Sequence, residues 1–201
     1  MDNNAMYKLT YGLFVITARD GDKDNGCIIN TASQVTTSPN RITVAVNKQN
    51  YTHDMIKKTG IFNVSILTEK SKFSTYQNFG FQTGKEVDKF EKFTFERAEN
   101  GVVYIPDETN AYISAKVVSE VDLGTHTLFI ADVTDAKVLS EDKSVTYEYY
   151  QNNIKPAPKT AEEKKTGWIC TVCGYIYEGE ELPADFVCPL CKHGAEDFKK
   201  L

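Results

Sequence analysis

The chain has 201 residues, of which 41% are hydrophobic and 25% charged, as in soluble globular proteins, so a disordered or low-complexity chain is excluded. The net charge is −5, and no long run of lysine and arginine is present, so we expect no nucleic-acid partner. The apolar runs are too short to cross a bilayer, and the N-terminus lacks the pattern of a secretory signal, so we expect a cytoplasmic protein with no membrane partner.

Residues 1–150 have the pattern of a mainly β domain. Runs that alternate or are rich in β-branched residues predict strands at 13–18, 41–47, 62–67, 111–118 and 128–133. Turn-forming clusters separate the runs, among them Asp24-Asn25-Gly26 and Ser38-Pro39-Asn40. Short helices are expected at 53–59, before Gly60, and at 72–79, before Gly80. Many short strands favour a barrel or a sandwich.

Two polar segments of this domain have the composition of a flavin site. Residues 30–36 are small and polar, lie between predicted strands, and could hydrogen-bond the pyrimidine edge of a flavin. Residues 48–52 precede the first predicted helix, where backbone N–H groups and the helix dipole attract a phosphate. Lys48 adds positive charge, and Thr52 is expected to cap the helix. Each segment alone is more often an ordinary turn.

In their order along the chain, these segments resemble the flavin reductase-like, FMN-binding split-barrel family. The stretches that carry the resemblance are Tyr11–Thr17, Asn30–Thr36 with Ser38-Pro39, Asn47–Thr52, Phe62–Leu67 and Gly124–Phe129. The resemblance implies that the isoalloxazine ring of FMN is held by Asn30, Thr31, Ala32, Ser33 and Gln34. It implies that the phosphate is held by Lys48, Asn50, Tyr51 and Thr52. It also implies a homodimer with FMN near the subunit interface.

Three further features have both a functional and a structural interpretation. His126 aligns with a family histidine near the flavin, where it could position a nicotinamide or a proton, but a histidine between strands is as often structural. Cys27 has no evident disulfide or metal partner and is interpreted as a small buried side chain. Residues 78–85 contain two Gly and two Phe and resemble the family loop that covers the flavin, although such turns frequently serve packing alone.

Residues 151–166 have the composition of a linker. The sequence QNNIKPAPKTAEEKKT lacks Val, Leu, Phe and Tyr and has four Lys against two Glu. Such a polar, proline-containing stretch is typical of a connection between domains. We therefore expect a first domain at 1–150, a linker at 151–166 and a second domain at 167–201.

Four of the five cysteines form two Cys-x2-Cys pairs, Cys170 with Cys173 and Cys188 with Cys191. The tight turn within each pair brings two sulfurs together, and four thiolates make a closed tetrahedral site for zinc or iron. A domain this small cannot bury enough surface to fold alone, so metal ligation must contribute to its folding free energy. The spacing alone favours a zinc ribbon without redox chemistry.

The residues around these pairs shift the balance toward iron. The stretches GWICTVCGYIY and FVCPLC closely resemble rubredoxin, with a spacer between the pairs as short as in the modules fused to rubrerythrins. Gly174 and Pro189 directly follow ligands, where compact residues let backbone N–H groups turn toward sulfur and tune an iron potential. The resemblance implies an Fe(Cys)4 centre, in which zinc can replace iron in recombinant protein.

A flavin domain fused to a rubredoxin joins a two-electron carrier to a one-electron carrier. Chains with this arrangement resemble the high-molecular-weight rubredoxins of anaerobes. That resemblance implies an oxidoreductase that passes electrons from an NAD(P)H-linked donor, via FMN and the iron centre, to a di-iron flavoprotein that reduces oxygen or nitric oxide. Two alternatives stay open: an NAD(P)H-dependent flavin reductase that supplies reduced FMN, and a zinc-stabilised flavin-binding scaffold.

Overall fold

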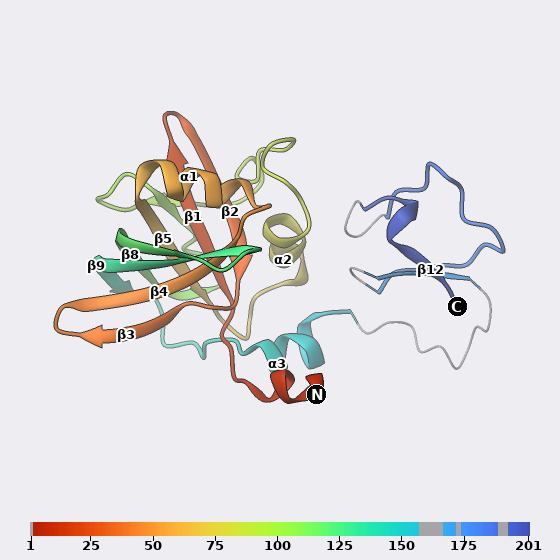
Figure 1. Ribbon diagram of the computed structural model, residues 1–201, viewed down its shortest axis with the longest axis horizontal. Coiled ribbons are helices and arrows are strands. Elements are labelled where there is room, and N and C mark those ends of the chain that lie inside the picture. Colours follow the sequence, from red (N-terminus) through yellow and green to blue (C-terminus); the bar gives the residue numbers. More distant parts are fainter. Residues whose placement is uncertain (1, 157–166, 172–173, 189–192) are drawn as a thin grey trace. The chain divides into compact units, whose positions relative to one another are not determined.

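The computed structural model describes residues 2–156, 167–171, 174–188 and 193–201 (Figure 1). The chain forms two compact units, Met1–Gln151 and Asn152–Leu201. None of the helices in these described ranges is both long enough and apolar enough to cross a membrane.

The strands of the first unit are β1 (Phe14–Asp20), β2 (Lys23–Ile29), β3 (Ser33–Thr37), β4 (Asn40–Asn47), β5 (Ile61–Leu67), β6 (Glu96–Arg97), β7 (Val103–Tyr104), β8 (Thr109–Asp122) and β9 (His126–Val138). Its α-helices are α1 (Tyr51–Thr59), α2 (Phe73–Gly80) and α3 (Tyr147–Tyr149). A 3-10 helix at Asn3–Lys8 precedes β1, and a π-helical turn at Tyr150–Ile154 follows α3.

Seven of these strands form one antiparallel sheet in the order β2-β1-β5-β8-β9-β4-β3. In β4 the alternate residues Ile42, Val44 and Val46 are buried, because successive side chains of a strand point to opposite faces. These residues join a core to which β1, β2, β5, β8, β9 and α1 also contribute. After β2, at one edge of the sheet, the Thr31 hydroxyl donates to the Ala45 carbonyl of β4 at 2.9 Å. This contact links the two ends of the sheet around the core, as in a partly open barrel.

The predicted strands at 13–18, 41–47, 62–67, 111–118 and 128–133 correspond to β1, β4, β5, β8 and β9. Both predicted helices form, and α1 packs against β1 and β2 (Figure 1). Gly60 ends α1 with a φ of 71°, a left-handed conformation that glycine adopts without strain. The expectation of a mainly β fold with short helices is therefore confirmed.

The expected turn at Asp24-Asn25-Gly26 is wrong, because these residues lie within β2. The actual turn contains Gly21, whose φ is 58°. Gly26 pairs with Thr17 of β1, and a Cβ on Gly26 would lie 3.1 Å from the Thr17 methyl carbon. Glycine at this position allows close packing between the strands, and the chain does not turn there.

The second unit contains the strands β10 (Trp168–Cys170), β11 (Ile176–Tyr177) and β12 (Phe198–Lys200), with a 3-10 helix at Ala195–Asp197. The strand order is β11-β10-β12. The Phe186 ring packs against Tyr177 and Phe198, with centroid separations of 4.6 and 5.4 Å. This aromatic cluster is small, so hydrophobic burial alone provides little stabilisation for the unit.

The predicted linker, 151–166, begins within the π-helical turn that follows α3. Its residues 157–166 lie outside the described residues.

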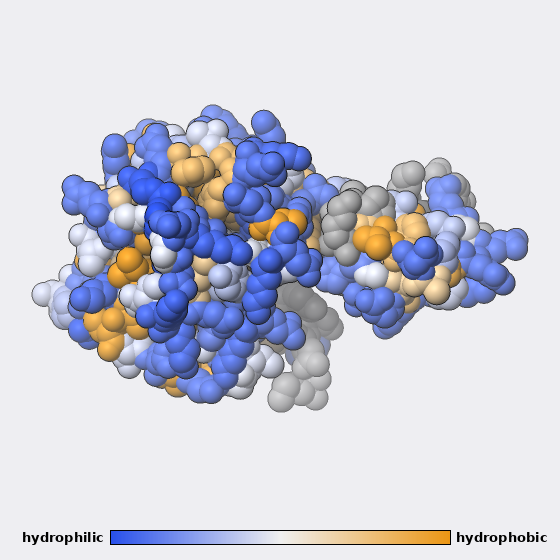
Figure 2. All heavy atoms as spheres, turned by 90° about the horizontal axis from the view of Figure 1, so that it is seen from above, coloured by the Kyte–Doolittle hydropathy of each residue, from blue (hydrophilic) through white to orange (hydrophobic). Residues whose placement is uncertain are grey.

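Figure 2 shows a face on which hydrophobic side chains form small separate patches among hydrophilic ones.

Candidate functional site

Three parts of the predicted flavin site meet near the end of β4. Thr31 donates to the Ala45 carbonyl and accepts from the Ala45 N–H, at 2.9 and 3.1 Å. Two residues further along β4, Asn47 pairs with His126 of β9. The Lys48 N–H then donates to the Thr125 carbonyl at 3.0 Å. The sheet register therefore brings together segments that are far apart in the sequence.

Within the segment expected to hold the isoalloxazine, much of the polar chemistry is already used by the fold. The Thr31 hydroxyl is already hydrogen-bonded to both the carbonyl and the N–H of Ala45. Ser33 and Gln34 begin the exposed strand β3, so the expectation that residues 30–36 lie between strands is wrong for 33–36. The Gln34 amide donates to the Asn40 side chain at 2.9 Å, across the β3–β4 hairpin. Asn30 and Ala32 are half-buried beside these contacts.

The start of α1 differs from the expectation in one important respect. The helix begins at Tyr51 with Asn50 as its N-cap, so the expected cap, Thr52, is instead the second helical residue. Its side chain is buried, and its Oγ1 accepts a hydrogen bond from the Asn25 amide at 3.0 Å. Asn50 makes no side-chain cap bond. Tyr51 is half-buried at the start of α1, whereas Thr52 is 0% exposed and its hydroxyl faces the core.

Lys48 makes an ion pair with Asp122, the last residue of β8, with Nζ 2.6 Å from Oδ1. The same carboxylate oxygen accepts the Gly124 N–H at 2.7 Å. The hydrogen bond from Lys48, followed by that from Gly124, lowers the pKa of Asp122. Lys48 lies three residues before α1, and its ammonium group contacts a carboxylate.

The two histidines of this region differ in their surroundings. His126 is half-buried at the start of β9, with Nδ1 2.9 Å from the Thr125 hydroxyl. His53, which sequence reasoning did not select, is buried in α1, with Nε2 2.8 Å from the Thr127 hydroxyl. His53 therefore links the first turn of α1 to Thr127 of β9, the residue that follows His126.

A buried lysine was also missed. Lys89 is 4% exposed, and its Nζ donates to the carbonyls of Gly26 and Phe79 at 2.9 and 3.1 Å. Burial lowers the pKa of Lys89 to about 8. Nearby Cys27 is buried, as expected, and burial raises the pKa of its thiol. A thiol of this kind is chemically inert, so the prediction of a packing role for Cys27 fits its surroundings.

The glycine- and phenylalanine-containing segment 78–85 packs against β2 and the start of α1. A Cβ on Gly84 would lie 2.0 Å from the Asn25 side-chain oxygen, so a larger residue there would have to displace the Asn25 side chain. The Lys85 ammonium lies 5.8 Å from the centroid of the Tyr51 ring and 3.9 Å from an Asp54 carboxylate oxygen. The segment thus lies beside the predicted phosphate-binding turn.

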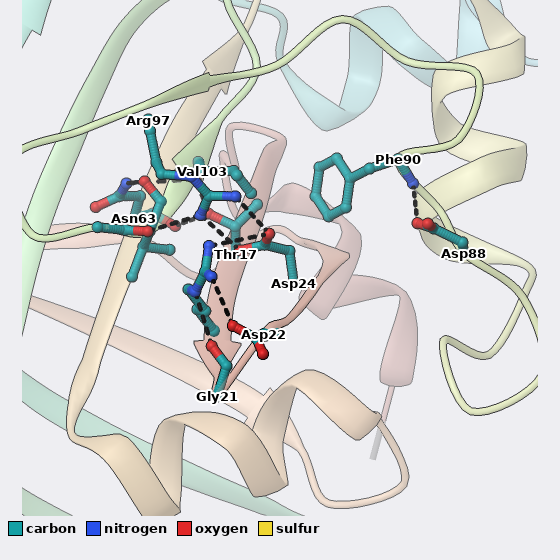
Figure 3. Close-up of polar contacts among 12 residues, drawn as sticks. Thr17, Gly21, Asp22, Asp24, Asn63, Asp88, Phe90, Arg97 and Val103 are labelled. Atoms are coloured by element: carbon teal, nitrogen blue, oxygen red, sulfur yellow. Dashed lines mark hydrogen bonds and ion pairs between the residues drawn. The ribbon is translucent and has the colours of Figure 1, made fainter.

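A cavity of about 880 Å³ opens between the tip of the β1–β2 hairpin and residues 84–95. Asp24 lines the cavity, and Figure 3 shows its carboxylate, which accepts hydrogen bonds from Arg97. The Asp24 carboxylate also lies 3.5 Å from Arg19, and Asp20 pairs with Lys58. None of the predicted flavin-binding residues lines this cavity. We assign no ligand to it.

Two of the four predicted metal ligands lie in the described part of the second unit, and both Cys170 and Cys188 are buried. The predicted ligands Cys173 and Cys191 lie outside the described residues. The Gly174 N–H donates to the Cys170 carbonyl at 2.9 Å, and Gly174 has a φ of 80°, which requires glycine. This tight turn and the soft sulfur donors fit a tetrathiolate site for iron or zinc.

Comparison with known protein families assigns both units. The sequence profile for the flavin reductase like domain matches residues 6–158. The chain belongs to the flavin reductase-like family. A second profile, for the rubrerythrin, rubredoxin-like domain, matches residues 168–199. The protein therefore combines a flavin reductase-like domain with a rubredoxin-like domain, and the expected two-part architecture is confirmed.

Individual relatives agree with this assignment. The high molecular weight rubredoxin of Moorella thermoacetica is 38% identical over 229 residues and covers 100% of both chains. The ferric-chelate reductase (NAD(P)H) of Archaeoglobus fulgidus is 38% identical over 162 residues, which are 80% of this chain and 96% of that protein. The structure of flavin reductase PheA2 in its native state superposes with a TM-score of 0.62 at 32% identity, covering 73% of this chain and 93% of that chain. The protein is an oxidoreductase.

Proposed function

We propose that this protein is an electron carrier in which the flavin reductase-like domain receives electrons from an NAD(P)H-linked donor. The rubredoxin-like domain delivers them to an acceptor such as a di-iron flavoprotein that reduces oxygen or nitric oxide. The observation that carries the proposal is the presence of both domains in one chain, in an arrangement shared over the full length with a high molecular weight rubredoxin. A domain that only released reduced flavin would need no second redox centre.

In this proposal the first domain binds FMN through the residues gathered at the end of β4. The start of α1, through the backbone N–H of Tyr51, binds the phosphate together with Lys48 and Asn50, and the buried Thr52 holds this turn against Asn25. Asn30, Thr31, Ala32, Ser33 and Gln34 bind the isoalloxazine, chiefly through their backbone because several side chains have partners already. His126 orients a nicotinamide or holds a proton beside the ring. Bound flavin supplies the exchange between two-electron and one-electron chemistry.

The second domain is proposed to hold one iron ion through Cys170, Cys173, Cys188 and Cys191. Buried sulfurs and the turn at Gly174 support this ligand set. Zinc is expected to occupy part of the sites in recombinant protein, because soft thiolates bind it readily. Only iron gives the site an electron-carrying role.

We also propose a homodimer that forms through β3 and β8. Apolar side chains are exposed on these strands and the following turn, including Val35 at 50%, Val121 at 44% and Leu123 at 53%. Exposed apolar residues on adjoining hairpins are typical of a surface that a second subunit covers. The dimer contact would lie next to the site at the end of β4, since β8 ends at Asp122, which contacts Lys48.

A second candidate is a reductase that acts through the first domain alone. The ferric-chelate reductase relative favours it, because 96% of that protein aligns with 80% of this chain. The third candidate function is a flavin-binding scaffold stabilised by zinc. Metal analysis and the visible spectrum of protein purified from its native source separate the electron carrier from the zinc-stabilised scaffold. The electron-carrier proposal predicts iron with the absorption of a ferric tetrathiolate beside that of FMN, and zinc without iron would contradict it.

Replacing Lys48 with alanine should weaken FMN binding by about 30-fold, since the change removes a charge-assisted hydrogen bond to a phosphate. The measurement is a titration of flavin fluorescence with the apoprotein. Lys57→Ala is the matched control, because Lys57 is an exposed lysine of α1 that pairs with Glu120. An unchanged FMN affinity in Lys48→Ala would show that the phosphate lies elsewhere.

A further inference from the structure

The ion pair between Lys48 and Asp122 places a carboxylate where the proposed function requires a phosphate. Lys48 Nζ lies 2.6 Å from Asp122 Oδ1, a short charge-assisted hydrogen bond. The side chains are 35% and 73% exposed, respectively, so the pair faces solvent and is accessible to a ligand. An incoming phosphate oxygen would compete with this carboxylate for the same ammonium group.

The backbone holds both partners of the pair in place. The Lys48 N–H donates to the Thr125 carbonyl at 3.0 Å, which ties the segment after β4 to the β8–β9 turn. Asp122 accepts the Gly124 N–H at 2.7 Å within that turn. Hydrogen bonds from Lys48 and Gly124 lower the pKa of Asp122, so the carboxylate is ionised at neutral pH. The anion is therefore a fixed part of the surface beside the first turn of α1.

We propose that Asp122 acts as an internal competitor for the flavin phosphate and thereby sets the affinity of the phosphate subsite. In the free protein the Asp122 carboxylate pairs with Lys48. When FMN binds, its phosphate displaces Asp122 from the lysine or shares the lysine with Asp122. A dianionic phosphate is the stronger acceptor, so Asp122 weakens binding without preventing it. This inference rests on the proposed function and adds a residue that tunes how tightly and how reversibly FMN is held.

The competitor acts on the phosphate alone, which separates its effect from a general effect on the fold. FMN carries the phosphate, whereas riboflavin presents the same ring without it. Removing the Asp122 charge should therefore change FMN affinity and leave riboflavin affinity unchanged.

The chain contains a matched control on the same strand. Glu120 lies two residues before Asp122, on the same face of β8, and its carboxylate pairs with Lys57 of α1 at 3.0 Å. Glu120→Gln removes the same charge as Asp122→Asn but frees a different lysine. Asp122→Asn retains a side-chain oxygen that can accept the Gly124 N–H, so the turn is preserved.

The experiment titrates FMN and riboflavin into the full-length apoproteins at low ionic strength and follows flavin fluorescence. We expect Asp122→Asn to bind FMN about two- to fivefold more tightly, the range of an exposed ion pair, with riboflavin affinity unchanged. Glu120→Gln should leave both affinities unchanged, because it frees Lys57 and keeps the Lys48–Asp122 pair intact. In a Lys48→Ala background, Asp122→Asn should give little gain, because the contested cation is absent.

Unchanged or weaker FMN binding by Asp122→Asn would overturn the inference, as would an equal gain with riboflavin or with Glu120→Gln. The proposed phosphate site is tested separately by Lys48→Ala. If that variant loses FMN affinity while Asp122→Asn gains none, the phosphate site stands and the competition fails. If Lys48→Ala has no effect, the phosphate site itself is wrong.

Discussion

Replacing Cys188 with serine is expected to remove the metal and unfold the rubredoxin-like unit while the flavin reductase-like unit stays folded. Cys188 is buried, and the aromatic cluster around Phe186 is small. Metal binding in such small domains contributes about 10 kcal/mol or more to folding, which exceeds what this core can provide. Loss of one of four ligands therefore removes most of the stabilisation of this unit.

The chain contains a built-in reporter for this experiment. Trp168, the only tryptophan, lies in β10 next to the metal-binding turn, and its indole N–H donates to the Glu180 carbonyl at 3.3 Å. Its fluorescence reports on the second unit, while FMN binding reports on the first. Cys27→Ser makes the same chemical change in the first unit and should keep both the metal and the Trp168 emission. A Cys188→Ser protein that retained metal and native emission would contradict the ligand assignment.

The free energy of unfolding of the first unit is expected to include a contribution from Lys89 that rises between about pH 8 and 10. Burial lowers the pKa of folded Lys89 to about 8, whereas an unfolded lysine titrates near 10.5. Between these values the unfolded state binds more protons, so raising the pH favours the folded state. The slope is about 1.4 kcal/mol per pH unit, and the whole contribution is about 3 kcal/mol.

The measurement is chemical unfolding followed by far-UV circular dichroism at several pH values, with Lys89→Met as the reference. Other groups titrate nearby: burial raises the pKa of Cys27, and burial raises that of Tyr76 to about 12, so both favour the unfolded state at higher pH. The difference between wild type and Lys89→Met isolates the lysine, and this difference should shift by about 2 to 3 kcal/mol in favour of wild type across the window. A difference independent of pH would mean that Lys89 titrates normally.

The fold was predictable where local pattern and long-range packing agree. The alternation of Ile42, Val44 and Val46 predicts a strand with one buried face, and β4 buries the face that carries these three residues. The β2 strand was missed because Asn25 and Gly26 have the composition of a turn. Asn25 is paired in the structure with Thr52, 27 residues away, and no local pattern contains that contact.

The candidate site was predictable to the level of segments but not of side-chain partners. Residues 30–34, 48–52 and His126 were selected separately. The sheet register places Thr31, Lys48 and His126 near the end of β4, whereas Ser33 and Gln34 pair with Thr43 and Ile42 further back along that strand. Asp122 and Lys89 were missed because their partners are distant: Lys48 is 74 residues from Asp122, and Gly26 is 63 residues from Lys89. The inward orientation of Thr52 likewise depends on β2, which the sequence pattern did not predict.

The central claim is that electrons leave the protein through its rubredoxin-like domain. The most direct test measures two rates under anaerobic conditions in wild-type protein and Cys188→Ser, both loaded with FMN. One rate is flavin reduction by an NAD(P)H-linked donor system, and the other is electron delivery to a di-iron flavoprotein. We predict that the variant keeps the first rate and loses the second by at least about tenfold, because only the exit is removed. Equal delivery by the two proteins would contradict the claim and would place the exit at the flavin domain itself.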